Sequence, residues 1–281
     1  MKALAFGEVL WDIYPDKKCI GGAPLNFAAH FVRCGGRAAL CSAVGTDDLA
    51  EQTLEAVQGF AVDTAFISRN ALPTGKCLVT LDENAVPCYQ LLENVAYDQI
   101  DIPTGLGEAW DVLYFGTLAL RSPCNRKSLQ ALISMDVFKQ IFVDINLRKP
   151  FVSEEAVRFA LEKATLLKVS AEELPEVCSL VGLASSEPEQ AALCLSEAYG
   201  NLRLVLITLG AEGAVAYDVA KREYHRCPAE PAKVVSTVGA GDSFSAAFLA
   251  QYLQARSIPD CLACAAKVSA FVVSHKAAIP L

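Results

Sequence analysis

The stretch "STVGAGDSFSAAF", residues 236–248, leads through a nearly bare backbone into a predicted helix. Gly239, Ala240 and Gly241 carry almost no side chain, so this part of the stretch adds little to a hydrophobic core. Asp242 follows directly, where an apolar helical pattern begins. The stretch therefore places one carboxylate beside exposed backbone amides.

The sequence on either side of this turn predicts a strand and a helix. "KVVST", residues 233–237, predicts the strand, and "SFSAAFLAQYLQ", residues 243–254, predicts the helix. In that helix Phe244, Phe248 and Tyr252 share one face, because they are four residues apart. Free amides at a helix N-terminus donate hydrogen bonds, and the helix dipole adds positive potential. The turn therefore predicts an anion site.

Two common phosphate-binding motifs do not describe this turn. No GxxxxGK[ST] sequence occurs in the chain, and Phe244 stands where the last glycine of a GxGxxG motif would be. A plainer alternative is that Asp242 only caps the helix and the glycines only make the turn.

A second glycine-rich turn, "IGGAPLNFAAH" at residues 20–30, also leads into a predicted helix. Asn26 lies in the first turns of that helix, and Asp12 lies upstream near the end of the first predicted strand. An Asp and an Asn beside a glycine turn can accept hydrogen bonds from sugar hydroxyls and donate to them. The alternative is a capped helix with polar surface residues.

The composition narrows the classes of function. The chain has 281 residues, 53% of them hydrophobic, which is enough for one large core or one domain with a small appendage. The net charge of -8 disfavours a nucleic-acid-binding surface. No apolar run reaches the roughly 18 residues that a membrane span needs. We expect neither nucleic acid nor membrane as a partner.

The cysteines and histidines indicate no metal site. The 11 cysteines are scattered, and the N-terminus runs straight into strand-like sequence with no signal peptide, so we expect reduced thiols in the cytoplasm. Cys261 and Cys264 have CxxC spacing within a predicted helix, which favours small apolar residues over a zinc site. His30, His225 and His275 lie far apart in sequence and are expected to be structural.

Short apolar strands alternate with helices along the chain. Strands are predicted in "KALAFGEVLW" (2–11), "RAALCSAVG" (37–45), "DVLYFG" (111–116), "QIFVDI" (140–145), "ATLLKV" (164–169) and "LRLVLITLG" (202–210). Each is expected to lead into a helical segment, for example 23–36 or 47–59, the latter with Asp47 as a cap. This alternation predicts an α/β fold with a parallel sheet covered on both faces.

One region departs from the alternation. "GKCLVTLDENAVPCYQLLE", residues 75–93, predicts two strands around a turn at residues 82–85, with no helix between them. We interpret this hairpin as part of a lid beside the sheet. The alternative is an edge hairpin with no role.

Several motifs together resemble those of the ribokinase family of carbohydrate kinases, also called the PfkB family. The motifs are "GEVLWDIYPD" (7–16), "GGAPLNFAAHFVRCGG" (21–36), "SAVGTDDLAEQTL" (42–54), "PTG" (73–75), "YFGTLALRSP" (114–123), "DINLRKPF" (144–151), "TLGAEGA" (208–214) and "TVGAGDSFSAAFL" (237–249). The two glycine motifs at this separation are specific for the family. The "GEVLWD", "LALRSP" and "DINLR" segments are similar to its bacterial fructokinase branch.

The resemblance implies a ribokinase-like three-layer α/β/α sandwich with a mostly parallel central sheet and a small β-sheet lid. It implies one kinase domain over residues 1–281, with the lid formed from about 10–20 and 73–97. The implied reaction is ATP-dependent phosphorylation of a sugar hydroxyl, with fructose as the first expected substrate. The alternatives are ketodeoxygluconate or ribose as the acceptor, or a non-catalytic protein that binds sugar or nucleotide. An exposed lid sheet would allow a homodimer.

The resemblance also implies roles for individual residues. The general base would be Asp242, and the anion hole would be formed by Gly239, Ala240 and Gly241. The sugar would be held by Asp12, Gly22 and Asn26, with Arg148 near the sugar or the phosphates. The nucleotide would lie along Thr208, Gly210 and Gly213, as well as Gly239 and Gly241. Magnesium would be held mostly by ATP phosphates and water, with Glu173 acting through water.

Three positions depart from the family pattern. Ser170 stands where the family usually has Asn in the magnesium and phosphate motif, although Glu173 of that motif is present. Ser236 stands in place of an Asp and Ala277 in place of a common Gly, and both positions bear on the family's monovalent-cation site. Because Ser236 offers no full negative charge, we expect potassium to bind weakly.

Overall fold

The protein, seen here as a computed structural model that describes residues 1–81, 87–107 and 109–280, has its strands in two sheets. The larger sheet has nine strands in the order β13-β12-β11-β10-β9-β8-β1-β4-β5. These strands are β1 (Lys2–Phe6), β4 (Arg37–Val44), β5 (Ile67–Arg69), β8 (Trp110–Phe115), β9 (Phe138–Asp144), β10 (Leu166–Ser170), β11 (Leu204–Thr208), β12 (Ala214–Asp218) and β13 (Glu223–Cys227). The strands from β11 to β5 pair in parallel, and β12 and β13 are antiparallel, so the sheet is mostly parallel.

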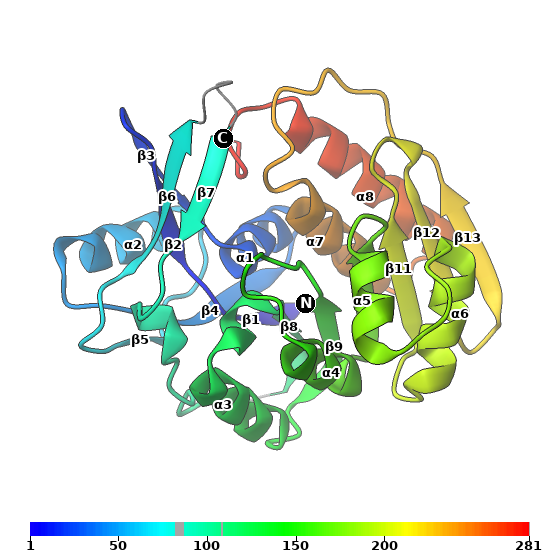
Figure 1. Cartoon of the computed structure of the whole chain (residues 1–281), viewed down its shortest axis with the longest axis horizontal. Helices are drawn as coiled ribbons and strands as arrows, with labels where there is room; N and C mark the ends of the chain where they lie inside the picture. Colours follow the sequence, from blue (N-terminus) through cyan, green and yellow to red (C-terminus); the bar gives the residue numbers. More distant parts are fainter. Residues whose placement is uncertain (82–86, 108, 281) are drawn as a thin grey trace.

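Helices cover both faces of this sheet (Figure 1). One face packs against α1 (Ala23–Arg33), α2 (Asp48–Gly59), α7 (Ala240–Tyr252) and α8 (Ile258–Val273), and the other against α3 (Pro123–Ile133), α4 (Glu154–Lys163), α5 (Leu174–Val181) and α6 (Pro188–Ala198). Alternate residues of β1 point into the two layers: Leu4 and Phe6 belong to one apolar cluster, and Ala3 and Ala5 to the other. The expected three-layer sandwich is confirmed.

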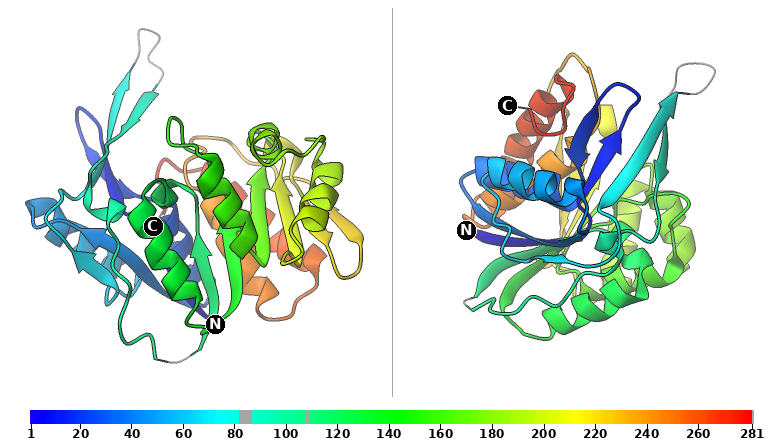
Figure 2. Two further views of the ribbon diagram at one scale, coloured as in Figure 1. Left: turned by 60° about the horizontal axis from the view of Figure 1, so that its bottom comes forward. Right: turned by 90° about the vertical axis from the view of Figure 1, so that its left-hand side faces the viewer.

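The second sheet has four strands and projects from the sandwich (Figure 2). Its order is β3 (Lys18–Gly21), β2 (Leu10–Ile13), β6 (Gly75–Leu81) and β7 (Pro87–Leu91). At its base Leu10, Cys77, Val95 and Tyr97 form a small buried cluster. This is the expected β-sheet lid, and the turn expected at residues 82–85 lies outside the described residues. Three short 3-10 helices complete the elements: η1 (Ala96–Asp98), η2 (Leu118–Arg121) and η3 (Gly210–Glu212).

The single strand predicted over residues 2–11 is wrong, because this segment contributes to both sheets. Gly7 ends β1 with φ +141°, and its amide donates to the carbonyl oxygen of Cys41 at 3.1 Å. The chain then leaves the large sheet and enters the lid as β2. A left-handed backbone at Gly7 is what allows this change of direction.

Two other sequence-based expectations are also wrong. Residues 233–237 form no strand: the amides of Val235 and Ser236 donate to the carbonyl oxygen of Val273 at the end of α8, and the Val235 side chain is exposed. β-branched residues favoured a strand there, but the hydrogen bonds to the end of α8 take the place of pairing with a sheet. The strand predicted at residues 202–210 is followed by the antiparallel strands β12 and β13, not by a helix of the covering layers.

Asp47 precedes α2 as expected, but its side chain does not cap that helix. The carboxylate accepts hydrogen bonds from the amide and hydroxyl groups of Thr74, just before β6. Asp47 therefore ties the base of the lid to the sandwich. Within the described residues, no helix has the length and apolar character needed to cross a bilayer.

Candidate active site

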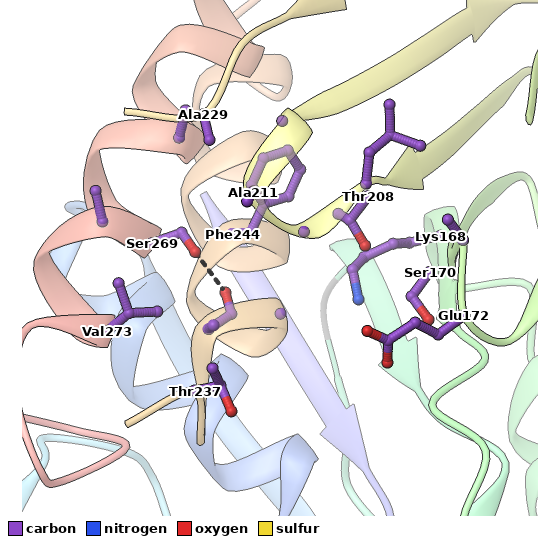
Figure 3. Close-up of a pocket in the computed structure, with 18 of the residues that line it drawn as sticks. Lys168, Ser170, Glu172, Thr208, Ala211, Ala229, Thr237, Phe244, Ser269 and Val273 are labelled. Atoms are coloured by element: carbon purple, nitrogen blue, oxygen red, sulfur yellow. Dashed lines mark hydrogen bonds between the residues drawn. The ribbon is translucent and has the colours of Figure 1, made fainter. Parts of the chain in front are cut away.

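Two pockets meet at the carboxyl end of the large sheet. The α8 pocket, of about 950 Å³, lies between the ends of β10 and β11 and the helices α7 and α8 (Figure 3). The lid pocket, of about 690 Å³, lies between the lid, α1 and α7. Both are lined by Asp144, Asn146, Arg148, Lys168, Thr237 and Gly241. Ligand sites at the carboxyl ends of parallel strands are the rule in open α/β sheets.

The turn before α7 lies where the two pockets meet. Gly239 is the N-cap of α7 with φ +81°, and a β-carbon there would lie 2.8 Å from the carbonyl oxygen of Ala278, so only glycine fits. Among the described residues, the amides of Gly239, Gly241 and Asp242 have no hydrogen-bond acceptor. Ala240 differs, since its amide donates to the carbonyl oxygen of Thr237 at 3.2 Å. Free amides at a helix N-terminus favour an anion.

Asp242 lies in the first turn of α7, which begins three residues earlier than predicted. Its carboxylate lines the lid pocket, and Oδ2 accepts a hydrogen bond from Nδ2 of Asn26 at 2.8 Å. Burial raises the pKa of Asp242 to about 6, and the nearby charge of Asp144 acts in the same direction. Burial thus outweighs the positive potential of the helix N-terminus, which favours the ionised form, but the carboxylate is still mostly ionised at pH 7.

A buried ion pair lies beneath the turn. Lys168 Nζ is 2.9 Å from both carboxylate oxygens of Asp144, and both side chains are almost inaccessible to solvent. The hydroxyl groups of Ser245 and Tyr114 lie 3.0 and 3.4 Å from Asp144 Oδ2. Burial lowers the pKa of Lys168, but the charge and hydrogen bonds of Asp144 outweigh it, so the net pKa is raised. Lys168 therefore stays protonated beside Gly241, where a β-carbon would lie 3.0 Å from Nζ.

The lid pocket brings together the residues expected to hold a sugar. Asp12 from β2, Gly22 before α1 and Asn26 in α1 all line it. Gly22 has φ +114°, and a β-carbon there would lie 2.4 Å from the carbonyl oxygen of Glu8. Asn26 Oδ1 is buried without a hydrogen-bond partner in the described protein. A buried acceptor of this kind calls for a donor from a ligand or water.

Glu8 adds a buried carboxyl group to the same pocket. Its Oε1 accepts a hydrogen bond from the amide of Ala23 at 3.2 Å, at the start of α1. Burial raises the pKa of Glu8 to about 7. Burial also raises the pKa of Asp12. Near neutral pH, Asp242 in the lid pocket is therefore mostly ionised, whereas Glu8 is partly protonated.

The α8 pocket contains the residues expected along a nucleotide. Thr208, Gly210 and Gly213 line it, near Phe244 of α7 and Ser269 of α8 (Figure 3). Gly213 has φ +100° and no room for a side chain, because a β-carbon would lie 2.0 Å from the carbonyl oxygen of Cys227. The exposed side chain of Arg148 lines both pockets.

Glu173 joins two loops at the edge of the α8 pocket. Its Oε1 accepts from the amide of Leu147 at 2.6 Å, and its Oε2 accepts from the amide and hydroxyl of Ser170 at 2.9 and 2.8 Å. The described residues contain no group of three or more His, Cys, Asp or Glu side chains placed to hold a metal ion. A metal here would depend on ligands from the substrate and water, with Glu173 able to accept a further hydrogen bond from water.

Sequence reasoning missed Glu8, Asp144 and Lys168. Each is a charged residue next to or within an apolar segment predicted as a parallel strand, as in "TLLKVS" at residues 165–170. Strands of a parallel sheet are buried on both faces, and a charge buried there must be paired or neutralised. A charged residue within or beside an apolar strand could therefore have been recognised from the sequence, but the residue that pairs with it could not.

The arrangement has one pocket on each side of a single turn, which carries both a carboxylate and free amides. Such a site can hold a hydroxyl group in one pocket and a phosphate chain in the other, and this defines a small-molecule kinase. A model of the pfkB family of carbohydrate kinases matches residues 16–281, and the chain belongs to this family.

Named relatives and a solved structure agree with this membership. The chain is 30% identical over 287 residues to "Probable fructokinase-4" of Arabidopsis thaliana, covering 91% of this chain and 83% of the relative. It is 30% identical over 266 residues to a fructokinase of Rhizobium leguminosarum bv. trifolii, covering 88% and 78%. The fructokinase of Vibrio cholerae O395, solved with fructose, ADP and a calcium ion, superposes with a TM-score of 0.83 at 26% identity, over 99% of this chain and 94% of that one.

The Lys168–Asp144 pair yields a prediction about stability. In Lys168→Met the Asp144 carboxylate would remain buried without its cation, so the free energy of unfolding should fall by about 3–5 kcal/mol. The matched control is Lys139→Met, which also breaks a Lys–Asp pair between neighbouring strands, Lys139 of β9 with Asp111 of β8 at 2.8 Å, but at an exposed position. The control should lose less than about 1 kcal/mol. Urea unfolding measures both, and similar losses in the two variants would contradict this account.

Proposed function

We propose that the protein transfers the γ-phosphoryl group of ATP to a hydroxyl group of a sugar, with fructose as the preferred acceptor. The observation that carries the proposal is the turn at Gly239–Asp242, which serves both pockets at once. Its carboxylate faces the lid pocket, and Gly241 lines both pockets. The Vibrio cholerae fructokinase of the same fold holds fructose and ADP, which supports this choice of acceptor and product.

In the proposed reaction Asp242 accepts the proton of the sugar hydroxyl. The hydroxyl oxygen attacks the γ-phosphorus, the bond from that phosphorus to the β,γ-bridging oxygen breaks, and ADP leaves. Asn26 holds Oδ2 of Asp242, which leaves Oδ1 free to meet the hydroxyl. With a pKa of about 6, the carboxylate is ready to accept a proton at pH 7 and is a stronger base than an ordinary aspartate.

The developing negative charge is met by groups of this chain. The free amides of Gly241 and Asp242 point from the helix N-terminus, and Gly239 provides the left-handed turn that presents them. Ala240 contributes its small size, because its amide is already bonded. Lys168 Nζ lies directly behind Gly241 and adds positive charge. Phosphoryl transfer depends mainly on positioning and on charge stabilisation of this kind.

Substrate binding divides between the pockets. We assign the sugar to Asp12, Gly22 and Asn26, with Glu8 added from the structure, and the phosphates of ATP to Arg148. The nucleotide would extend past Thr208, Gly210 and Gly213. Magnesium carried by the phosphates would neutralise charge, with Glu173 contacting it through water. The lid would exclude water, which competes with the sugar as acceptor.

Other features of the chain remain proposals. We propose that residues 1–281 act as one kinase domain in the cytoplasm, with the lid built from about 10–20 and 73–97. The edge strands β3 and β7 of the lid offer the surface for the expected homodimer. Weak potassium dependence is proposed on Ser236, whose hydroxyl accepts from the amide of Val238 at 3.3 Å and brings no charge.

The direct test is ATP consumption with magnesium and a panel of fructose, ribose, ketodeoxygluconate, glucose and adenosine. We expect fructose to give the highest kcat/KM. A preference of more than about tenfold for another sugar would place the protein elsewhere among the pfkB kinases. ATP consumption with none of them, together with measurable sugar or nucleotide binding, would favour the non-catalytic alternative.

Replacing the base should abolish most turnover. Asp242→Asn keeps the size of the side chain but cannot take a proton, so kcat should fall by roughly 10² to 10⁴. In the unmutated enzyme kcat/KM should fall as the pH drops through about 6, because the pKa of Asp242 is raised to that value and the protonated acid is inactive. The mutant should lack this titration. Asp260→Asn, in the first turn of α8, is the control and should keep both rate and profile.

Substitutions at two residues of the lid pocket, Asp12 and Asn26, should have different effects on the kinetics. Asp12→Ala should weaken sugar use by roughly 1–3 kcal/mol through lost hydrogen bonds, with ATP affinity unchanged. Asn26→Ala should weaken sugar use and also shift the pH profile upward, because the hydrogen bond from Asn26 lowers the pKa of Asp242. Steady-state kinetics across pH and nucleotide titration separate the two. Equal losses for sugar and ATP in Asp12→Ala would count against the assignment.

A further inference from the structure

One face of α1 carries three polar side chains one turn apart, at Asn26, His30 and Arg33. Asn26 bonds Asp242 of α7, as described above. The Nε2 atom of His30 lies 2.8 Å from the carbonyl oxygen of Ala278, and the guanidinium of Arg33 donates to the carbonyl oxygen of Pro280. The same face of α1 therefore contacts both the first turn of α7 and the C-terminal segment 275–280.

The bond from His30 has a fixed direction. A carbonyl oxygen only accepts, so His30 must carry its proton on Nε2. His30 is buried in the described structure, and burial lowers its pKa, so the ring is neutral near pH 7. A buried donor with one acceptor in reach holds that acceptor firmly, because losing the bond would leave a polar group unsatisfied.

Ala278 is also the wall behind the anion-binding turn. A β-carbon on Gly239 would lie 2.8 Å from both the β-carbon and the carbonyl oxygen of Ala278, and 2.9 Å from its α-carbon. The backbone of Gly239 thus rests on the residue whose carbonyl His30 holds. Gly239 is the N-cap of α7, so its position sets where the amides of Gly241 and Asp242 point.

We propose that His30 is a positioning residue for phosphoryl transfer, acting through Ala278 on Gly239 and the free amides of the turn. The inference rests on the proposed function for the role of that turn. His30 is absent from the residues that line the two pockets, so it contacts neither substrate. Together with Asn26 it lets α1 fix the carboxylate and the amides from one helix face. A misplacement of about 1 Å at such a site costs on the order of 10²-fold in rate.

The first test is kinetic. His30→Leu fills similar space without a donor, and we expect kcat to fall at least about tenfold, with KM for sugar and for ATP within about threefold, since only transition-state contacts are displaced. His30→Gln places an amide donor at the reach of Nε2 and should recover most of the rate. An unchanged kcat in His30→Leu, or no recovery in His30→Gln beside normal folding, would overturn the proposal.

The second test observes the turn without turnover. Hydrogen–deuterium exchange of the ligand-free protein should show faster exchange in His30→Leu, by about tenfold or more, for the amides of Ala240 and Ser243, which donate to the carbonyl oxygens of Thr237 and Gly239 and so report on the order of the turn. The control is Asn201→Leu, which removes side-chain bonds to the carbonyl oxygens of Leu161 and Ala164, away from both pockets. The control should lose stability without faster exchange at the turn.

The outcomes separate this proposal from the proposed function. Equal exchange at the turn in the unmutated protein and His30→Leu would overturn the positioning role even if fructose is phosphorylated. Faster exchange in a protein that phosphorylates none of the sugars would leave the link from His30 to the turn intact and refute the proposed kinase function.

The double variant Ala278→Gly with His30→Leu should lower kcat by less than the product of the two single effects, because both substitutions act through one contact.

Discussion

The buried pair of Lys168 and Asp144 is the interaction on which the site depends. The two residues face each other in register on neighbouring strands β10 and β9, and the same carboxylate is approached by Tyr114 of β8 and Ser245 of α7. An unpaired charge in this interior would be very unfavourable, so the two strands and α7 are held in one relative position. The turn of Gly239–Asp242 rests directly above, with Lys168 Nζ filling the space behind Gly241.

Burial beside this pair explains why the pKa values of two carboxyl groups lie near neutral pH. Asp242 is buried close to Asp144, and Glu8 is buried close enough to Asp242 to feel its charge; burial raises the pKa of Asp242 to about 6 and of Glu8 to about 7. A carboxyl group with a raised pKa binds more protons in the folded than in the unfolded protein. Each group therefore lowers stability as the pH rises from its unfolded value through its folded one. At pH 7 Asp242 and Glu8 therefore lower the free energy of unfolding, and both line the lid pocket. Perturbed pKa values at pocket residues are typical of a functional site.

The path of the chain between the two sheets gives the lid pocket its mixed walls. After β1 the chain turns at Gly7, passes Glu8 and enters the lid, and it returns through Gly22 to α1. Asp12 therefore belongs to the lid, whereas Asn26 and Asp242 belong to the sandwich. The shape of this pocket depends on how the two sheets are oriented, so a change in the lid would alter the walls of the pocket before it altered the turn. Asp47, bonded to Thr74, is one of the contacts that limits such a change.

The sequence by itself determined the α/β class, the lid hairpin and the glycine turn at Asp242, because these depend on local periodicity and on residues with few backbone options. It did not determine which partner a segment with strand-like sequence pairs with. Residues 2–11 contribute strands to two sheets, and residues 233–237 form no strand, because pairing depends on how the rest of the chain is arranged around them. The candidate residues Asp12, Gly22 and Asn26 could be named in advance, but their convergence with Glu8 could not. Only the tertiary structure decided that Lys168 pairs with Asp144 and that His30 reaches Ala278, because partners 24 and 248 residues apart in the chain meet through the packing of strands and helices.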